Sequence, residues 1–313
     1  MSIGIKAIAS YIPPSVIDNI TQGLEFSEDE TFIRNKIGAL KLPIKGEDQD
    51  TSDLAVAAIK ALTAKNPNFN SQLLDVLVVV TQNGDGAGLP HTSAIVQQKL
   101  GLPNTVAAFD VSLGCSGYVY GLFVLKGFLQ ATGLRNGLLV TADPYSKIVD
   151  RSDRVTSLLF GDAATATWVG NEPCWRLGEV AFGTDGEGAE HLHVKNSKLN
   201  MNGRQVFNFA ATKVAPHIQQ VLQKANLEIE QVDAFCIHQG SAAIVDTIAR
   251  RFGQMSSRFI LDIEQTGNTV SSSIPLLLEK HAFDSNWKHV IISGFGVGLS
   301  WATALLEREE RAN

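Results

Sequence analysis

The sequence predicts a protein of the α/β class that consists of two similar halves. Short runs rich in β-branched residues alternate with longer stretches of helical period, with Gly and Asp between them. One pattern, an apolar residue, an Asp, a buried strand, a Gln and a helix that ends in Gly, occurs at 73–101 and again at 231–253. No linker rich in Pro, Gly or Ser divides the chain. We therefore expect halves of about 1–170 and 171–313, packed as one unit with the functional cleft between them.

In the first half, three buried strands alternate with two helices. Their apolar runs are typical of a buried sheet, because strands that are covered on both faces are apolar almost throughout. The second helix is apolar nearly all round, which predicts a position in the core. The expected elements are, in order, a strand at 75–80, a helix at 91–101, a strand at 106–112, a helix at 116–133 and a strand at 137–143.

The second half repeats this order. A strand at 231–239 leads into a helix at 241–253. The late run KHVIISGFG at 288–296 corresponds to the run NGLLVTAD at 136–143. The repetition, rather than any break in the chain, is what suggests two halves.

The composition limits the class of protein. With 313 residues and 44% hydrophobic content, the chain can bury one large core or two ordinary ones. Its formal net charge of −6 comes from scattered residues, whereas a nucleic-acid surface or an anionic membrane requires a basic patch. The run LLDVLVVV is too short to span a bilayer, and we see no signal peptide. We expect a soluble, cytoplasmic protein that binds neither nucleic acid nor membrane.

The chain has three cysteines, Cys115, Cys174 and Cys236. An odd, sparse set without regular spacing is typical of a reducing compartment rather than of a disulfide framework. Cys236 lies in the middle of a strand and Cys174 lies beside Pro173, positions that suit packing. The sequence has no Walker motif, zinc spacing or HExxH motif, so we expect no metal and no cofactor.

Cys115 is different, because it opens the apolar helix at 116–133. A thiol at a helix N-terminus lies near the positive end of the macrodipole, and free N–H groups face it. Both effects favour the thiolate, the nucleophilic form of cysteine. The alternative is that Cys115 is a small buried apolar residue, as cysteine often is. Its position between Gly114 and Ser116-Gly117 favours a nucleophile.

Two polar side chains are candidate partners of this thiol. His238 ends the buried strand at 231–239, and strand ends in α/β proteins face the ligand crevice. Asn268 follows Gly267 in a turn, where its amide could donate a hydrogen bond to a substrate oxygen. The segment SGFGVGLSW at 293–301 suits a loop of backbone donors for an oxyanion. We interpret the remaining histidines, at 91, 191, 193, 217, 281 and 289, as surface residues.

Cys115, His238, Asn268 and a late Gly-rich loop follow one another in this order. In this order and spacing the chain resembles the β-ketoacyl-acyl-carrier-protein synthase III family, over almost its whole length. The resemblance implies the thiolase fold, in which two α/β halves form five layers, αβαβα. The matching segments are AAFDVSLGCSGYVYGL at 107–122, LLFGDAATA at 158–166, MNGRQVFNFA at 201–210, VDAFCIHQG at 232–240, GNT at 267–269 and GFGVGLSW at 294–301.

The resemblance also implies a reaction. Cys115 takes the acyl group of an acyl-CoA primer, and a malonyl thioester, carried by acyl carrier protein (ACP) or by CoA, then enters. His238 and Asn268 hold the enolate that forms as carbon dioxide leaves, and the carbanion attacks the acyl-cysteine. The backbone N–H groups of Cys115 and Gly296 hold the oxyanion. By this resemblance, a Cys-His-Asn set favours decarboxylating condensation. The reversible thiolase reaction is instead typical of a site with a further catalytic cysteine.

Further substrate-binding residues carry over by position. Phe32 and Arg154 match positions that sandwich the adenine of CoA, with Phe32 in place of the usual tryptophan. Lys36 matches a basic residue near the CoA phosphates. Phe207 and Phe295 lie in matching segments and are counted with the substrate-binding residues.

Leu89 matches a position at which an aromatic side chain of the partner subunit often closes the acyl pocket. A homodimer is therefore expected. Because leucine is smaller, we predict a deeper pocket and a primer longer than acetyl.

The chain departs from the family after His238. Ala243 stands where the family usually has an arginine that docks the acidic carrier protein, although Arg250 and Arg251 follow. Asn208 stands where a lysine is common. Docking of a carrier protein thus stays open. The departures suggest a specialised synthase, which feeds fatty acid synthesis from a preformed acyl-CoA or makes an acyl group for a surface sugar or a signalling molecule.

Two other functions stay open at this point. The acyl group on Cys115 could pass to an amine, hydroxyl or thiol acceptor without decarboxylation. Alternatively, the chain could be an inert partner subunit of a hetero-oligomer, although an intact Cys, His and Asn argues against that.

Overall fold

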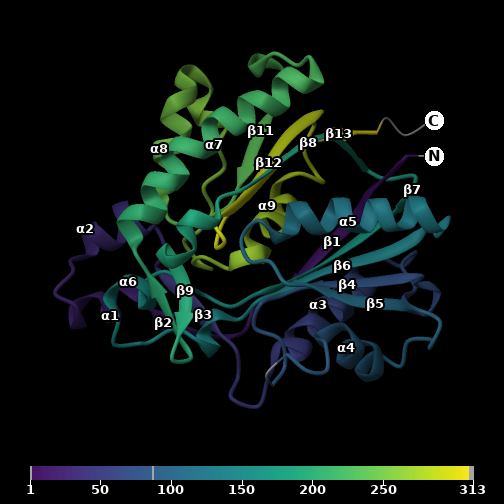
Figure 1. Cartoon of the computed structure of the whole chain (residues 1–313), viewed down its shortest axis with the longest axis horizontal. Helices are drawn as coiled ribbons and strands as arrows, with labels where there is room; N and C mark the ends of the chain where they lie inside the picture. Colours follow the sequence, from purple (N-terminus) through teal and green to yellow (C-terminus); the bar gives the residue numbers. More distant parts are fainter. Residues whose placement is uncertain (1, 87, 310–313) are drawn as a thin grey trace.

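The computed structural model describes residues 2–86 and 88–309. Within this part of the chain, the centre of the molecule is a sheet of nine strands (Figure 1). In spatial order these are β11 (Ala234–Ile237), β12 (His289–Gly296), β13 (Ser300–Arg308), β8 (Trp175–Thr184), β1 (Ile3–Tyr11), β7 (Ala164–Asn171), β6 (Asn136–Ala142), β4 (Val76–Val80) and β5 (Ala107–Val111).

The two ends of this sheet have the same topology. On one side β4 pairs parallel with β6, β6 antiparallel with β7, and β7 antiparallel with β1. On the other side β11, β12, β13 and β8 pair with the same directions in the same order. The two runs of strands join at β1 and β8, which pair at only two positions. The predicted division after residue 170 falls at the end of β7 and stays a prediction.

The repeat is incomplete at one edge. β5 pairs parallel with β4 over five residues. The corresponding position beside β11 holds a single parallel bridge between Phe235 and Phe259. The second run of strands therefore lacks a full counterpart of β5.

Helices cover the two runs of strands in layers (Figure 1). α3 (Thr51–Lys65) and α4 (Thr92–Leu100) pack on the outer face of the β4 side, and α7 (Gly203–Ala225) and α8 (Ala242–Ala249) on the outer face of the β11 side. Two helices, α5 (Gly117–Thr132) and α9 (Ser273–His281), lie between the runs and pack against both. This is the predicted αβαβα arrangement.

The alternation of side chains along the strands explains the layers. Val76, Val78 and Val80 of β4 face α5, whereas Leu77 and Val79 face α3. All five are fully buried. A strand in this position needs apolar residues on both faces, as its continuous apolar run predicted.

Cys236 of β11 faces the central helices in the same way and is fully buried, which fits its interpretation as a packing residue. His217 of α7 corrects one expectation. It is buried rather than on the surface, and its Nδ1 lies 2.9 Å from the hydroxyl of Thr303. Its helix has a polar sequence overall, but this residue faces the sheet.

The remaining elements gather at one end of the molecule, at the left of Figure 1. They are β2 (Ser15–Asp18), α1 (Asn19–Glu25), α2 (Glu30–Phe32), a π-helix (Ile33–Ile37), β3 (Lys41–Ile44), α6 (Arg154–Ser157), β9 (Leu192–Lys195) and β10 (Lys198–Met201). Five of them contribute lining residues to the site described below.

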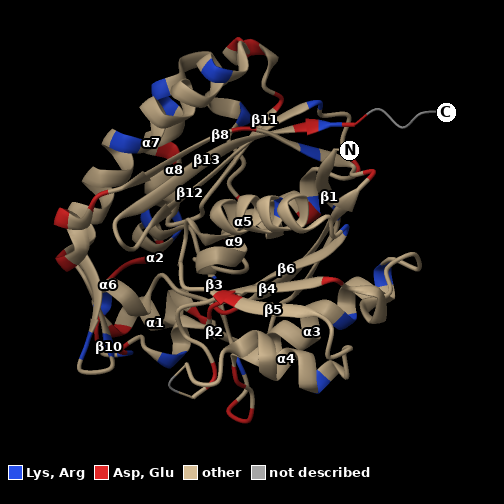
Figure 2. Cartoon of the chain, turned by 45° about the vertical axis from the view of Figure 1, so that its right-hand side comes forward, with Lys and Arg blue, Asp and Glu red and all other residues tan. Residues whose placement is uncertain are grey.

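Figure 2 shows acidic and basic residues interspersed over the outer helices and loops. Of the helices in the described part of the chain, none combines the length and the apolar character that a membrane span requires.

Candidate active site

One pocket of about 200 Å³ brings the three predicted chemical groups together. Cys115 reaches it from the start of α5, His238 from the end of β11, and Asn268 from the loop before α9. All three are at most 5% exposed. The pocket therefore brings together residues of both predicted halves, as the expected cleft requires.

Glycines of β12 allow the strand to approach Cys115. A Cβ atom on Gly296 would lie 2.9 Å from the Cys115 sulfur, and one on Gly294 would lie 2.6 Å from the Cys115 carbonyl oxygen. Both distances are shorter than a Cβ atom tolerates to an atom to which it is not bonded. The glycines of this segment are thus required first of all because a side chain at either position would collide with Cys115.

The ionisation state of Cys115 differs from the expectation. Burial, followed by the negative charge of Asp143, raises the pKa of the Cys115 thiol to about 12. The backbone N–H groups of Cys115 and Val297 act in the opposite direction. A helix N-terminus contributes about 0.3–1 kcal/mol, less than one pKa unit, so it does not offset burial. At neutral pH the resting sulfur is a thiol, not a thiolate.

His238 is a neutral imidazole. Burial lowers its pKa to about 3, although the backbone of Val270 acts to raise it. Its Nδ1 lies 2.8 Å from the hydroxyl oxygen of Ser273. The edge of the ring meets the ring of Phe295, with centroids 5.4 Å apart. These contacts fix the plane of the imidazole and leave Nε2 for the pocket.

Asn268 is held by its neighbours on both sides. Its backbone N–H donates to the carbonyl of Leu159 at 2.8 Å, and its side-chain Oδ1 accepts the N–H of Val270 at 2.9 Å. This contact fixes the orientation of the amide, and Nδ2, its only donor group, is left for a substrate. Gly267 precedes it with φ +64°, and a Cβ there would lie 2.5 Å from Leu42. The Gly-Asn pair of the sequence is therefore a requirement of the turn.

Of the other predicted residues, five also line this pocket: Phe32, Arg154, Phe207, Phe295 and Gly296. The guanidinium carbon of Arg154 lies 5.5 Å from the centre of the Phe32 ring, and its Nε lies 2.5 Å from Glu28.

Lys36 and Leu89 do not line the pocket in this chain. Lys36 lies exposed in the π-helix. The side chain of Leu89 is 88% exposed. Because the role of Leu89 was stated for the pocket of a partner subunit, that role stays a prediction.

Sequence reasoning missed most of the apolar wall. The additional lining residues include Tyr145, Phe160, Leu192, Met201, Val206 and Ile244. Tyr145 follows β6, and its ring packs on Phe160 with centroids 4.8 Å apart. The rule that selected His238, a polar residue after a buried strand, would also have selected Tyr145.

Two family models match the chain. Residues 109–186 match the model described as 3-oxoacyl-[acyl-carrier-protein (ACP)] synthase III, and residues 222–308 match its C-terminal model. The first range contains Cys115 and the second contains His238 and Asn268.

Whole proteins match over nearly the full length. The beta-ketoacyl-[acyl-carrier-protein] synthase III of Staphylococcus aureus is 33% identical, over 98% of this chain and 99% of the relative. A 2.1 Å crystal structure of 3-oxoacyl-(acyl-carrier-protein) synthase III superposes with a TM-score of 0.91 at 32% identity, covering 98% of this chain and 100% of that one. The enzyme of Thermus thermophilus gives 0.89 at 32%, covering 98% and 99%. The chain therefore belongs to the 3-oxoacyl-[acyl-carrier-protein] synthase III family.

Proposed function

We propose that the chain is a condensing acyltransferase of the β-ketoacyl-acyl-carrier-protein synthase III type, active in fatty acid synthesis. It joins an acyl-CoA primer to a malonyl thioester, with loss of carbon dioxide, and gives a β-ketoacyl thioester. The observation that carries this proposal is the meeting of Cys115, His238 and Asn268 at one pocket, in a chain with full-length relatives of this name.

Cys115 is the proposed nucleophile. Its sulfur attacks the thioester carbonyl of the primer, CoA leaves, and the acyl group stays on Sγ. The N–H groups of Cys115 and Val297 already act on this sulfur, so they suit an oxyanion that forms beside it. We therefore assign the second donor to Val297, while a donor role of Gly296 stays a prediction.

His238 and Asn268 are the proposed donors to the malonyl thioester oxygen. Loss of carbon dioxide generates the carbanion, so the site needs hydrogen-bond donors for the enolate rather than a strong base. A neutral imidazole and a carboxamide with its oxygen already occupied fit that requirement. Burial strengthens both hydrogen bonds, because the surrounding dielectric constant is low.

The other functions are less well supported. Acyl transfer without decarboxylation does not need a pair of donors aimed at an enolate. An inert subunit does not need an intact set of three chemical groups at one pocket.

Two measurements on the purified protein test the proposal. Incubation with a panel of acyl-CoAs should add the mass of one acyl group, and the variant Cys115→Ala should add none. Labelled malonyl thioester should then release carbon dioxide only from the acylated protein. Acylation without release of carbon dioxide would instead support the simple acyltransferase, and no adduct would support the inert subunit.

Phe32 and Arg154 are proposed to bind the adenine of CoA at the mouth of the pocket. The guanidinium carbon of Arg154 already lies over the ring of Phe32, 5.5 Å from its centre. The purine would enter between them, so that Arg154 exchanges part of its contact with Glu28 for the base. Lys36, on the π-helix that follows Phe32, is proposed to meet the CoA phosphates.

Leu89 is proposed to close the acyl pocket of the partner subunit in a homodimer. Its exposed side chain is free to enter a neighbouring molecule. A leucine leaves more depth than an aromatic ring, so a primer longer than acetyl is favoured. We also propose a cytoplasmic location, supported by the three free thiols of Cys115, Cys174 and Cys236.

For the extender, we propose malonyl-ACP, docked weakly. Arg250, next to α8, is paired with Asp246 at 2.8 Å, and Ala243 contributes no charge. The surface around the helix therefore offers less positive charge to an acidic protein than the usual arginine would. Comparison of KM for malonyl-ACP and malonyl-CoA checks this, and the substitution Ala243→Arg should lower KM for malonyl-ACP only.

A further inference from the structure

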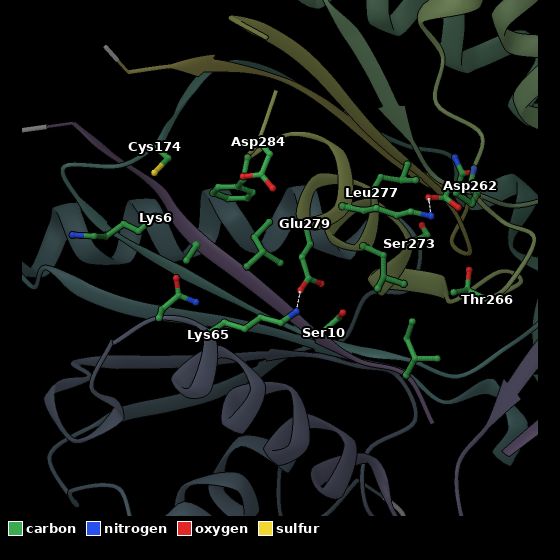
Figure 3. A pocket seen from close by; sticks show the side chains of 18 of the residues that line it. Lys6, Ser10, Lys65, Cys174, Asp262, Thr266, Ser273, Leu277, Glu279 and Asp284 are labelled. Carbon is green, nitrogen blue, oxygen red and sulfur yellow. Dashed lines mark hydrogen bonds and ion pairs between the residues drawn. The ribbon is translucent and has the colours of Figure 1, made fainter. Parts of the chain in front are cut away.

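A second cavity lies behind His238, on the side away from the acyl pocket. It holds about 1140 Å³ and is open to solvent. Ion pairs line its walls, among them Lys65 with Glu279 and Lys280 with Asp262, both at 2.6 Å (Figure 3). Ser273 lines this cavity, whereas its hydrogen-bond partner His238 lines the small pocket. One hydrogen bond thus links the imidazole to a residue that lines a polar cavity open to solvent.

The Ser273 hydroxyl can satisfy either neutral form of His238. Its oxygen lies 2.8 Å from Nδ1 and 3.1 Å from the Val270 carbonyl oxygen. A hydroxyl has one proton to donate and lone pairs to accept with. In one arrangement it donates to Val270 and accepts Nδ1–H, which leaves Nε2 as a lone pair. In the other it donates to Nδ1, and Nε2 carries the proton.

The two half-reactions require different forms. Cys115 rests as a thiol, so acylation requires a group that accepts its proton, and Nε2 must then be unprotonated. Enolate formation requires Nε2 as a donor, and it must then carry a proton. Burial disfavours the charged imidazolium that would otherwise combine both tasks. A neutral imidazole can serve both steps only if it changes tautomer between them.

We propose that Ser273 relays protons between Nδ1 of His238 and solvent in the second cavity, so that His238 changes tautomer between the half-reactions. Ser273 is then a positioning and relay residue that acts through His238 rather than on the substrate. The inference rests on the proposed function, because it assigns the proton transfers of that reaction.

The protons balance in both half-reactions. In acylation, Sγ–H breaks and its proton passes to Nε2, while Nδ1–H passes to Ser273, which releases a proton to the cavity. The sulfur bonds to the acyl carbon, and the CoA thiolate leaves and is protonated in solvent.

In condensation, the new C–C bond forms, carbon dioxide leaves, and Sγ departs as a thiolate. It takes the Nε2 proton, and Nδ1 takes one from Ser273, which takes one from the cavity. Each turnover consumes one proton.

The test is single-turnover acylation by an acyl-CoA in mixtures of H₂O and D₂O, followed by intact-mass measurement. In the wild-type protein three protons move together, from Sγ, from Nδ1 and from Ser273, so the rate should depend on the deuterium fraction along a curve. Ser273→Ala should slow acylation about 100-fold, the lower end for loss of a proton-transfer group, and should make the dependence linear. Ser273→Thr, which keeps the hydroxyl, should restore both rate and curvature.

The chain offers a matched control two residues earlier. The hydroxyl of Ser271 is buried and has no hydrogen-bond partner among the described residues, so Ser271→Ala should keep the wild-type rate and curve. Acylation of Ser273→Ala at the wild-type rate, or a slow rate that keeps the curvature, would overturn the relay. So would a linear dependence in the wild-type protein, a measurement that does not rely on the folding of any variant. Failure of the proposed function looks different, because the wild-type protein would then form no acyl adduct at all.

Discussion

The two cavities on either side of His238 differ in size, lining and chemistry. The larger, of about 1140 Å³, has ion pairs on its walls, and the smaller, of about 200 Å³, has mainly apolar walls. Of the residues that line either cavity, those with strongly shifted pKa values line the smaller one, since burial raises the pKa of Cys115 to about 12 and lowers that of His238 to about 3. Reactivity in this protein therefore follows the removal of water rather than the volume of a cavity.

The largest change in activity is expected from substitution of Asn268, which lines the smaller cavity. Asn268→Ala removes a donor to the enolate, which should slow condensation about 10²- to 10³-fold, as loss of one such donor does elsewhere. Acylation of Cys115 should stay at the wild-type rate, since no enolate forms in that step. Release of labelled carbon dioxide and single-turnover acylation measure the two steps separately. Equal losses in both steps would contradict the assignment.

The second effect concerns the buried carboxyl beside the small pocket. Burial raises the pKa of Asp143 to about 7, above the usual value of 3.8. Between these values the folded chain binds more protons than the unfolded chain, so the free energy of unfolding should fall as pH rises, on the order of a few kcal/mol in total. Asp143→Asn keeps an acceptor for the N–H groups of Gln82 and Asn83 but cannot ionise, and it should flatten this dependence.

Denaturant unfolding at several pH values between 4 and 8 measures the effect of Asp143. Parallel curves for the wild type and Asp143→Asn would show that the carboxyl is not responsible.

The third effect concerns the depth of the small pocket. Leu89→Phe should lower activity on C6–C10 acyl-CoAs about 10-fold relative to acetyl-CoA, a typical discrimination by a few methylene groups in an apolar pocket. Leu73, with 68% of its surface exposed, offers a control, and Leu73→Phe should not change the profile. Strict acetyl preference in the wild-type protein would refute the prediction of a long primer.

The smallest effect is expected in the large cavity. Lys65 and Glu279 lie 2.6 Å apart, but the lysine side chain is 58% exposed. Such pairs contribute about 0–1 kcal/mol, so Lys65→Met should change the free energy of unfolding by no more than that. It should leave kcat unchanged as well. A tenfold loss of activity would mean that the Lys65–Glu279 ion pair itself takes part in the chemistry, which the proposed proton path through Ser273 does not require.

The bounds of the buried strands and of the central helix were predicted closely from the sequence, because long apolar runs are stable only when they are buried in the core. The helix predicted at 116–133 runs from Gly117 to Thr132. The helix predicted at 241–253 was too long, since α8 ends at Ala249 and Gly253 has φ 55° and ψ −119°. A glycine near a helix end does not reveal from sequence whether the helix stops before it.

The site was predictable in part. Residue types and their order selected Cys115, His238 and Asn268, which depend on local position. Protonation depends on burial by distant segments, so the thiol form of Cys115 was not predicted.

The run Ser271-Ser272-Ser273 illustrates the same limit. Ser271 has no partner among the described residues, Ser272 meets Thr141, and Ser273 meets His238. The three consecutive serines therefore differ in their contacts, and these contacts follow from the fold rather than from the local sequence.

The incomplete repeat of the sheet has a consequence for assembly. β5 pairs on one side only among the described residues, so its outer N–H and C=O groups are open to another strand. At the opposite end, the segment at Phe259 and Ile260 already occupies the border of β11, with Ile260 N–H bonded to the Phe235 carbonyl. Of the two borders of this nine-stranded sheet, β5 rather than β11 is therefore the one that a further strand can extend.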